Sequence, residues 1–253
     1  MTTNVVSPEL KAILRRLKLS PMLDTLPERV ALARQRKMPH QDFLELVLAD
    51  EVTRRDSKSA VMRAHKANLD PNMVVDRWDE SSGVTFDHEL WSELTTLRFL
   101  EDANNILIMG PVGVGKTFMA NALGNIACRR RNSVLMLRAD RMLKRLKAAR
   151  LDASHEVELR KLIRVDLLIV DDFALHQLDS VETQDVYDIV VERHRRAATI
   201  VTSNRSPDEW LATMADPLLA QSAIDRLQSA AYELVVEGES YRRRQKPQRK
   251  SAR

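Results

Sequence analysis

One stretch decides the fold: Asn105-Ile-Leu-Ile-Met-Gly-Pro-Val-Gly-Val-Gly-Lys-Thr117. An apolar segment runs here directly into a loop with the pattern G-x-x-x-x-G-K-T, and a helix is expected from Lys116 to about Arg131. Glycines let successive N–H groups point inward at a phosphate, and the start of the helix adds its dipole. Lys116 supplies a charge for the phosphates and the Thr117 hydroxyl is a ligand for Mg²⁺. The pattern therefore predicts a nucleoside triphosphate site. Its predicted contacts are Gly110, Pro111, Val112, Gly113, Val114, Gly115, Lys116, Thr117 and Phe118.

Two acidic residues follow a second apolar segment, Leu167-Leu-Ile-Val-Asp171-Asp172. A parallel strand that ends here would place both carboxylates at the carboxyl edge of a sheet, beside the phosphate loop. Asp171 is expected to hold Mg²⁺, and Asp172 to orient or deprotonate an attacking water. Taken alone, an Asp-Asp pair is also common as a helix N-cap or turn.

A third apolar segment, Thr199-Ile-Val-Thr-Ser-Asn204, carries an amide at its polar end. Asn204 should emerge next to the Asp171 strand, where it can hydrogen-bond both a γ-phosphate and a lytic water. The alternative is an asparagine that caps a loop.

Strands alternate with helices through the rest of the chain, which predicts an α/β fold with a parallel sheet flanked by helices. The further expected strands are Ser133 to Leu137, Asp166 to Val170 and Tyr232 to Val236. Helices are expected over about Ala139 to Arg150, Glu156 to Leu162 and Val181 to Arg196.

The first third of the chain predicts a small all-helical domain over residues 1–69. Ser7-Pro8 is a plausible helix start, a second helix begins near Ser20-Pro21 or after Thr25, and a third runs from Pro39 to about Ala67. Pro27 would kink a helix that spans both starts. Proline, glycine and acidic residues from Asp70 to Gly83 indicate a linker. Residues 70–241 are then the α/β domain, and residues 242–253 form a basic tail.

Composition narrows the class of protein. The chain has 253 residues, of which 44% are hydrophobic and only one, Cys128, is a cysteine. A disulfide framework within one chain is excluded, and Cys128 is expected to be a small buried residue. Because no apolar run approaches the length of a transmembrane helix and the N-terminus does not resemble a signal peptide, we expect a cytoplasmic protein without membrane association.

Charge is unevenly distributed. Residues 1–69 hold 13 basic and 8 acidic groups, residues 70–241 hold 20 and 28, and residues 242–253 hold 7 and none. This favours an acidic nucleotide-binding body with local basic patches. The tail is either a solvated end or a polyanion-binding segment.

The densest basic stretch in the body runs from Arg129 to Arg150. On the helix expected from Ala139, Arg141, Lys144 and Arg145 share one face. Such a face suits phosphate contacts, and the scarcity of aromatic residues favours duplex DNA held by its backbone. A solvated helix face is the alternative. The predicted DNA contacts are Arg138, Arg141, Lys144, Arg145 and Lys147.

Together these residues resemble the AAA+ P-loop ATPases, and more narrowly the IstB-like and DnaC-like branch, over nearly the whole chain. The matching motifs are the phosphate loop, Val170-Asp-Asp-Phe173, Thr202-Ser-Asn-Arg-Ser-Pro-Asp-Glu-Trp210, Asp225-Arg226-Leu227 and Ser240-Tyr241-Arg242. Phe43-Leu44 and Glu51 in the helical segment also resemble the IstB proteins that accompany insertion-sequence transposases. The resemblance implies ATP and Mg²⁺ as cofactors.

The resemblance also implies roles for two arginines. Arg226 would act in trans as an arginine finger on the ATP of a neighbouring subunit, and Arg242 would match a second phosphate sensor. Without the resemblance, Arg226 is an arginine on a short amphipathic helix and Arg242 opens a basic tail. With only 49 residues after Asn204, a neighbour is expected to complete the pocket, so the resemblance predicts a homo-oligomer.

The resulting hypothesis is an ATP-dependent helper of transposition that oligomerises on duplex target DNA, hydrolyses ATP and stimulates a separate transposase. The first alternative is a DnaC-like loader of a replicative helicase, which would prefer single-stranded DNA. The second is a small-molecule phosphotransferase, which would phosphorylate a small acceptor.

Overall fold

The computed structural model describes residues 6–79 and 83–241. The chain divides into two compact units, Met1–Ala60 and Val61–Arg253, and the division falls inside the long helix α3 (His40–Lys66). The sequence places a domain boundary after residue 69 instead. That boundary remains a prediction about domains, and the two units are described separately below.

The first unit contains α1 (Pro8–Arg16), α2 (Met22–Gln35) and the first part of α3. The Ser7 side chain caps α1 as expected, because its Oγ accepts a hydrogen bond from the backbone N–H of Leu10 at 3.2 Å. α2 begins after Ser20-Pro21, the first of the two expected starts, and continues through Pro27. Leu14, Met22, Leu26 and Val47 form the small buried core of this unit.

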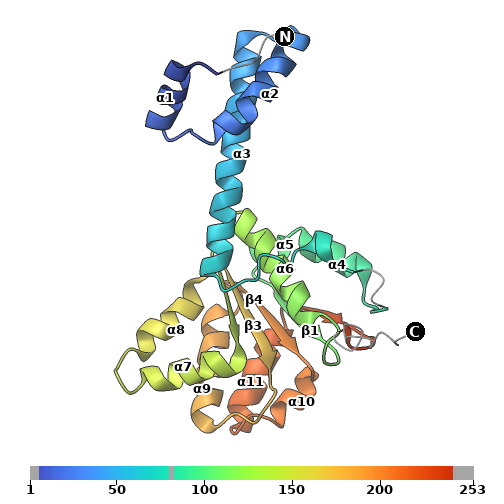
Figure 1. The fold of residues 1–253 in the computed structure, drawn as a ribbon. Helices are drawn as coiled ribbons and strands as arrows, with labels where there is room; N and C mark the ends of the chain where they lie inside the picture. Colours follow the sequence, from blue (N-terminus) through green and yellow to red (C-terminus); the bar gives the residue numbers. More distant parts are fainter. Residues whose placement is uncertain (1–5, 80–82, 242–253) are drawn as a thin grey trace, which may run out of the picture. The chain divides into compact units, whose positions relative to one another are not determined.

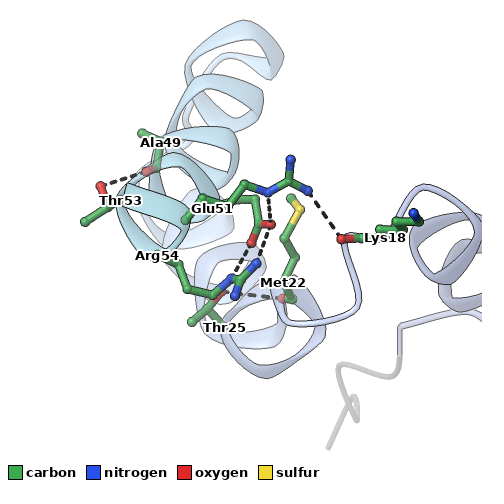
Figure 2. A network of polar contacts seen from close by, with 8 residues as sticks. Lys18, Met22, Thr25, Ala49, Glu51, Thr53 and Arg54 are labelled. Atoms are coloured by element: carbon green, nitrogen blue, oxygen red, sulfur yellow. Dashed lines mark hydrogen bonds and ion pairs between the residues drawn. The ribbon is translucent and has the colours of Figure 1, made fainter. Parts of the chain in front are cut away.

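A buried carboxylate organises the polar side of this unit (Figure 2). Glu51 is 5% exposed and accepts hydrogen bonds from Arg54 Nε at 2.7 Å and from Arg55 Nε at 2.7 Å. Arg55 also donates to the backbone oxygen of Lys18 at 3.3 Å. The hydrogen bond from Arg54 is the main reason why the pKa of Glu51 is lowered to about 2. Arg55, which Glu51 holds in place, therefore links α3 to the turn after α1.

The second unit contains a five-stranded sheet in the order β2-β3-β4-β1-β5, and all of its pairings are parallel. In chain order the strands are β1 (Asn105–Met109), β2 (Val134–Arg138), β3 (Leu167–Phe173), β4 (Ala198–Ser203) and β5 (Ala231–Val235). The predicted α/β fold with a parallel sheet is confirmed. Because the strands are parallel, all five carboxyl ends lie at one edge of the sheet.

Helices cover both faces of this sheet, as Figure 1 shows. On β1, Leu107 and Met109 belong to one core and Ile106 and Ile108 to the other, as the alternation of a strand requires. The first core contains side chains from α7 (Ala139–Ala149), α8 (His155–Arg164), α9 (Ser180–Arg193), α10 (Pro207–Leu211) and α11 (Pro217–Gln228). The second contains side chains from α4 (His88–Thr95), α5 (Arg98–Glu101) and α6 (Lys116–Arg129).

The segment expected to be a linker is packed onto the second unit. Asn121 on α6 accepts a hydrogen bond from the backbone N–H of Asp70, and Asn125 donates to the backbone oxygens of Asp70 and Met73, each at 2.9 Å. The segment continues through a short 3₁₀ helix, η1 (Val75–Arg77), to Trp78. The helix-breaking residues of this segment predict a linker. The asparagines that hold it in place lie about fifty positions farther along the chain, so no local pattern indicates them.

Cys128 is 0% exposed, and its burial raises the pKa of the thiol, which confirms the expected packing role. Among residues 6–79 and 83–241, none of the helices has the length and apolar character needed to span a membrane.

Candidate functional site

The glycine-rich loop connects β1 to α6 at the carboxyl edge of the sheet. Gly110 and Gly113 have positive φ angles of 144° and 86°. A Cβ on Gly110 would lie 1.9 Å from the backbone oxygen of Val236, and one on Gly113 would lie 2.2 Å from Ser240 Oγ. Both positions therefore need glycine for two reasons, the backbone conformation and the close approach of the segment that follows β5.

Lys116 opens α6, and its ammonium group turns back toward the loop. Nζ donates to the backbone oxygens of Gly110 at 2.8 Å and Pro111 at 2.7 Å, and to Asn204 Oδ1 at 2.6 Å. Asn204 directly follows β4, so the expected convergence of the third segment on the loop is present in the structure. The lysine is 6% exposed, which places a cation in a poorly solvated position.

Asp171 and Thr117 are joined by a hydrogen bond. The Thr117 hydroxyl donates to Asp171 Oδ1 at 2.9 Å, and the Thr202 hydroxyl donates to the same oxygen at 2.6 Å. Asp171 is 4% exposed. Burial raises its pKa above the ordinary aspartate value, and the hydrogen bonds from Thr202 and Thr117 act in the opposite direction. A buried carboxylate beside a threonine hydroxyl offers oxygen ligands of the kind that Mg²⁺ prefers.

Asp172 lies at an irregularity in the sheet. The pairing of β3 with β4 shifts register between Val170 and Phe173, and Asp172 has a positive φ of 56°. Its backbone N–H donates to the Thr202 hydroxyl at 3.0 Å. Its side chain is 33% exposed, and Oδ2 lies 3.9 Å from Arg138 Nε. The irregularity thus directs Asp171 into the protein while Asp172 remains accessible to solvent.

A cavity of about 650 Å³ lies over the loop, which is within the usual size range for small-molecule sites. Of the predicted contacts, the cavity is lined by Val112, Gly113, Val114, Gly115, Lys116, Thr117, Phe118, Asp172 and Asn204. Arg138, predicted to contact DNA, also lines it. Gly110 and Pro111 are hydrogen-bonded to Lys116, which lines the cavity. Asp171 is hydrogen-bonded to Thr117, which also lines it.

Sequence reasoning missed an apolar wall of this cavity. Trp78 lines it, and its ring lies 5.5 Å from that of Phe118 and 5.6 Å from that of Phe86. Met73, Val84, Leu175 and Tyr241 are further apolar or aromatic lining residues. Trp78 and Phe86 are the available signal, but proline, glycine and acidic residues from Asp70 to Gly83 predict a linker here.

The segment after β5 forms a second contact with the loop. The backbone N–H of Val236 donates to Met109 O at 2.8 Å, and that of Tyr241 donates to Gly113 O at 2.9 Å. Thr85 and Glu237 exchange backbone hydrogen bonds of 2.9 Å in each direction. The residues before Arg242 are thus attached to the glycine-rich loop, whereas Arg242 itself lies outside the described residues.

Arg226 is not brought to this cavity. It lies on α11 and donates to Ser222 O at 2.8 Å and, through a short contact, to Ser222 Oγ. His194, the residue after α9, lies with Nδ1 at 3.1 Å from the backbone oxygen of Arg226. In the part of the chain that the structure describes, no ion pair joins Arg226 to a carboxylate.

Three of the five predicted DNA contacts form ion pairs with nearby carboxylates. Arg138 lies 3.3 Å from Asp140, Arg145 lies 2.6 Å from Glu158, and Lys147 lies 2.6 Å from Asp179. The other two, Arg141 and Lys144, are exposed on α7.

The class of protein follows from three features of the fold, namely the strand order, the glycine-rich loop and the polar ends of β3 and β4. They are those of a P-loop nucleotide-binding protein of the AAA+ type. In agreement, the fold is similar to the crystal structure of the DnaC helicase loader, with a TM-score of 0.53 at 18% identity over 59% of this chain and 87% of that chain. It is also similar to AMPPCP-bound DnaA from Aquifex aeolicus, with a TM-score of 0.55 at 22% identity over 65% of this chain and 50% of that chain.

The family follows from the sequence comparison. The family model described as IstB-like ATP binding protein matches residues 12–249, and the chain therefore belongs to that family. An ATP-binding protein in an insertion sequence of Mycobacterium tuberculosis is 32% identical over 247 residues, which covers 97% of this chain and 98% of that protein.

Proposed function

We propose that this chain is an ATPase that oligomerises on duplex DNA and stimulates a separate transposase. The observation that carries the proposal is the convergence of Lys116 with Asn204 and of Thr117 with Asp171 around one loop. A site that only bound a nucleotide would need the loop and its lysine. A site that hydrolyses ATP also needs groups that act on the γ-phosphate and on a water.

Thr117 and Asp171 would hold Mg²⁺ together with the phosphates of ATP. When bound, the ion neutralises charge on the β- and γ-phosphates. The chain's own contribution is to keep two oxygen ligands 2.9 Å apart, one of them on the buried Asp171, so that the ligands are arranged before the nucleotide arrives.

Lys116, Asn204 and Asp172 would then act on the γ-phosphate and the lytic water. The hydrogen bond from Lys116 to Asn204 keeps the amide at the end of the loop, within reach of both groups. The accessible carboxylate of Asp172 would orient the water and accept its proton. Trp78 and Phe118 form an apolar wall beside Gly115, suited to contact with the adenine base.

Arg226 is proposed to complete the site of a neighbouring subunit. It is absent from the lining of the cavity in its own chain, and its described partner is the uncharged Ser222. An arginine that keeps its full charge can stabilise transition-state charge in trans, an effect worth about 10³ to 10⁵ in the rate of hydrolysis. Oligomerisation is thus part of the proposed mechanism.

DNA and a transposase are proposed as partners because relatives of this chain are ATP-binding proteins of insertion sequences. An insertion sequence moves by cutting and joining DNA. We assign that chemistry to the separate transposase and ATP hydrolysis to this chain.

The shared site can be tested by mixing two inactive variants. Arg226→Ala should bind ATP but hydrolyse it at least about a hundredfold more slowly, because it lacks the arginine supplied in trans. Asp172→Asn should be inactive in its own pocket but still offer Arg226 to a neighbour. We expect their mixture, with duplex DNA present, to recover part of the ATPase activity, measured as phosphate release.

Lys116→Ala is the control for the pocket, since it should lose nucleotide binding and give no activity in any mixture. A mixture of Arg226→Ala and Asp172→Asn with no more activity than either variant alone would contradict the shared site. Tighter binding of the wild-type chain to single-stranded than to duplex DNA would instead favour a helicase loader.

A further inference from the structure

The basic residues around α7 are largely offset by carboxylates. Besides the ion pairs of Arg138, Arg145 and Lys147, Arg150 lies 2.8 Å from Asp185, which is completely buried. A cation that already has a carboxylate partner gains less from a phosphate, because the carboxylate must first be released or must repel the phosphate. The stretch from Arg129 to Arg150 is the richest in basic residues, but several of its cations are already paired with carboxylates. Arginines that form no ion pair are therefore better suited to bind a phosphate.

Four other arginines lie on the chain segments that meet at the end of α6. We call Arg63, Arg98, Arg129 and Arg130 the arginine cluster. Arg63, on the last part of α3, donates from Nε to the backbone oxygen of Cys128 at 2.8 Å. Arg130 donates to the backbone oxygen of Thr96, two positions before Arg98, through a short contact. These bonds join the last part of α3 and the residue that follows α4 to the end of α6.

The positive charge of the arginine cluster is not offset by ion pairs within the described residues. Among the residues that the structure describes, none of its four members forms an ion pair, and Arg98, Arg129 and Arg130 are exposed. The hydrogen bonds of Arg63 and Arg130 go to backbone carbonyls, which orient a guanidinium without neutralising it. The acidic side chains that follow Arg98 on the chain, Glu101 and Asp102, form no ion pair with the cluster in this part of the structure.

Local contacts explain only half of this arrangement. Arg63 and Arg130 satisfy carbonyl groups at the ends of helices, which is a structural function. Arg98 and Arg129 are exposed and adjoin these contacts in the chain, since Arg98 comes two positions after Thr96 and Arg129 comes next to Arg130. They add charge to a body whose residues 70–241 hold 20 basic and 28 acidic groups. A local concentration of guanidinium groups on an acidic body directs a polyanion to one surface.

We propose that the arginine cluster binds the phosphate backbone of duplex DNA. This inference rests on the proposed function and names the surface that would hold the DNA. The planar guanidinium donates two parallel hydrogen bonds to a phosphate, so arginine suits this contact better than lysine.

The test compares two pairs of exposed cations in the full chain. Arg98→Gln with Arg129→Gln removes two charges from the arginine cluster, and Arg141→Gln with Lys144→Gln removes two from α7. Binding to a labelled random-sequence duplex is measured by anisotropy over a range of salt, with a nonhydrolysable ATP analogue. We expect the first pair to weaken binding about tenfold or more and to reduce the slope of log K against log salt by about 2. The second pair should leave both values close to wild type.

Arg98→Lys with Arg129→Lys retains the charge and should restore most of the salt slope, which separates charge from any loss of folding. An unchanged affinity in the first pair, or an equal loss in both pairs, would overturn the inference while leaving DNA binding itself intact. Loss of binding to anionic phosphatidylglycerol vesicles, with DNA binding unaffected, would assign the cluster to membranes and also overturn it. A wild-type chain that binds no duplex would contradict the proposed function itself.

Discussion

At the scale of single residues, the two acids of the Asp171-Asp172 pair differ in burial. Asp171 is 4% exposed and accepts two threonine hydroxyl groups, whereas the Asp172 side chain is 33% exposed and lies 3.9 Å from Arg138. Adjacent residues on a strand point to opposite faces, and the register shift after Val170 adds to this separation. Asp171 is therefore suited to hold an ion, and Asp172 is suited to act on a water.

The sequence predicts that Asp171, Asp172 and Asn204 lie at one edge of the sheet, because each comes at the end of an apolar run and parallel strands end at the same edge. In the structure Asp171 and Asp172 come just before Phe173, the last residue of β3, and Asn204 follows β4. The sequence could not place Trp78 or Tyr241 at the cavity. Both reach it through packing and backbone contacts with residues distant in the chain, and such contacts leave no local pattern.

Glu51 supports a prediction about pH. Its pKa is lowered to about 2, mainly by the hydrogen bond from Arg54, against an ordinary value of about 4.3 in the unfolded chain. A lowered pKa means that the carboxylate stabilises the first unit fully above about pH 4.3, and that this contribution is lost as the pH falls toward 2. Glu51→Gln should therefore unfold at a lower urea concentration than wild type at pH 7, and the difference should shrink between pH 4.5 and pH 2.

The measurement is the urea midpoint of the first unit, followed by circular dichroism across this pH range. Glu45→Gln, an exposed acidic residue earlier on the same helix, serves as the matched control for loss of one negative charge. A difference between wild type and Glu51→Gln that stays constant down to pH 2 would contradict the assignment of the pKa.

At the scale of elements, Arg193 at the end of α9 joins three parts of the α/β unit. It is 2% exposed and donates to the backbone oxygens of Leu162, Ile163 and Val165 at 2.8 to 2.9 Å. It also donates to Ala198 O and to the Thr199 hydroxyl. The end of α8 and the beginning of β4 are thereby fixed to α9. Burial lowers the pKa of Arg193 to about 10, so the side chain is charged at neutral pH.

We expect Arg193→Met to destabilise the second unit by about 3 kcal/mol or more, because several buried carbonyl groups lose their donor. Arg193→Lys should restore only part of this, since an ammonium cannot reach the same set of oxygens as a guanidinium. Urea unfolding followed by fluorescence measures both. Arg196→Lys is the control, because that side chain is 73% exposed and pairs with Glu192 at 3.2 Å. A change below about 1 kcal/mol for Arg193→Met would show that the carbonyls find other donors.

Arg193 also shows where sequence reasoning reaches its limit for an element. The sequence predicts a helix from about Val181 to Arg196, whereas α9 ends at Arg193. The strands before and after it were found from their apolar runs, since a buried parallel strand is apolar throughout. A buried arginine cannot be recognised in a segment that also contains Arg195 and Arg196, because the three have the same chemistry and differ only in tertiary contacts.

At the scale of the whole molecule, the two compact units have unequal cores. The first, residues up to Ala60, buries Leu14, Met22, Leu26 and Val47 as its cluster. The second has two large clusters, one on each face of the sheet. Small cores give low stability, so the first unit should unfold before the second when the chain is heated.

Nucleotide binding should affect these two transitions differently, because every lining residue of the cavity belongs to the second unit. A ligand stabilises the part that binds it, by about 2.7 kcal/mol when its concentration is about a hundredfold above Kd. For a unit of this size that corresponds to a rise in Tm of about 5 to 10 °C. We expect a nonhydrolysable ATP analogue with Mg²⁺ to raise the second calorimetric transition by this amount and to leave the first unchanged.

Glu51→Gln identifies the first transition by lowering it alone, and Lys116→Ala should abolish the shift of the second. An equal rise of both transitions in the wild-type chain would show that the units unfold together, and no rise in either would refute nucleotide binding at the glycine-rich loop.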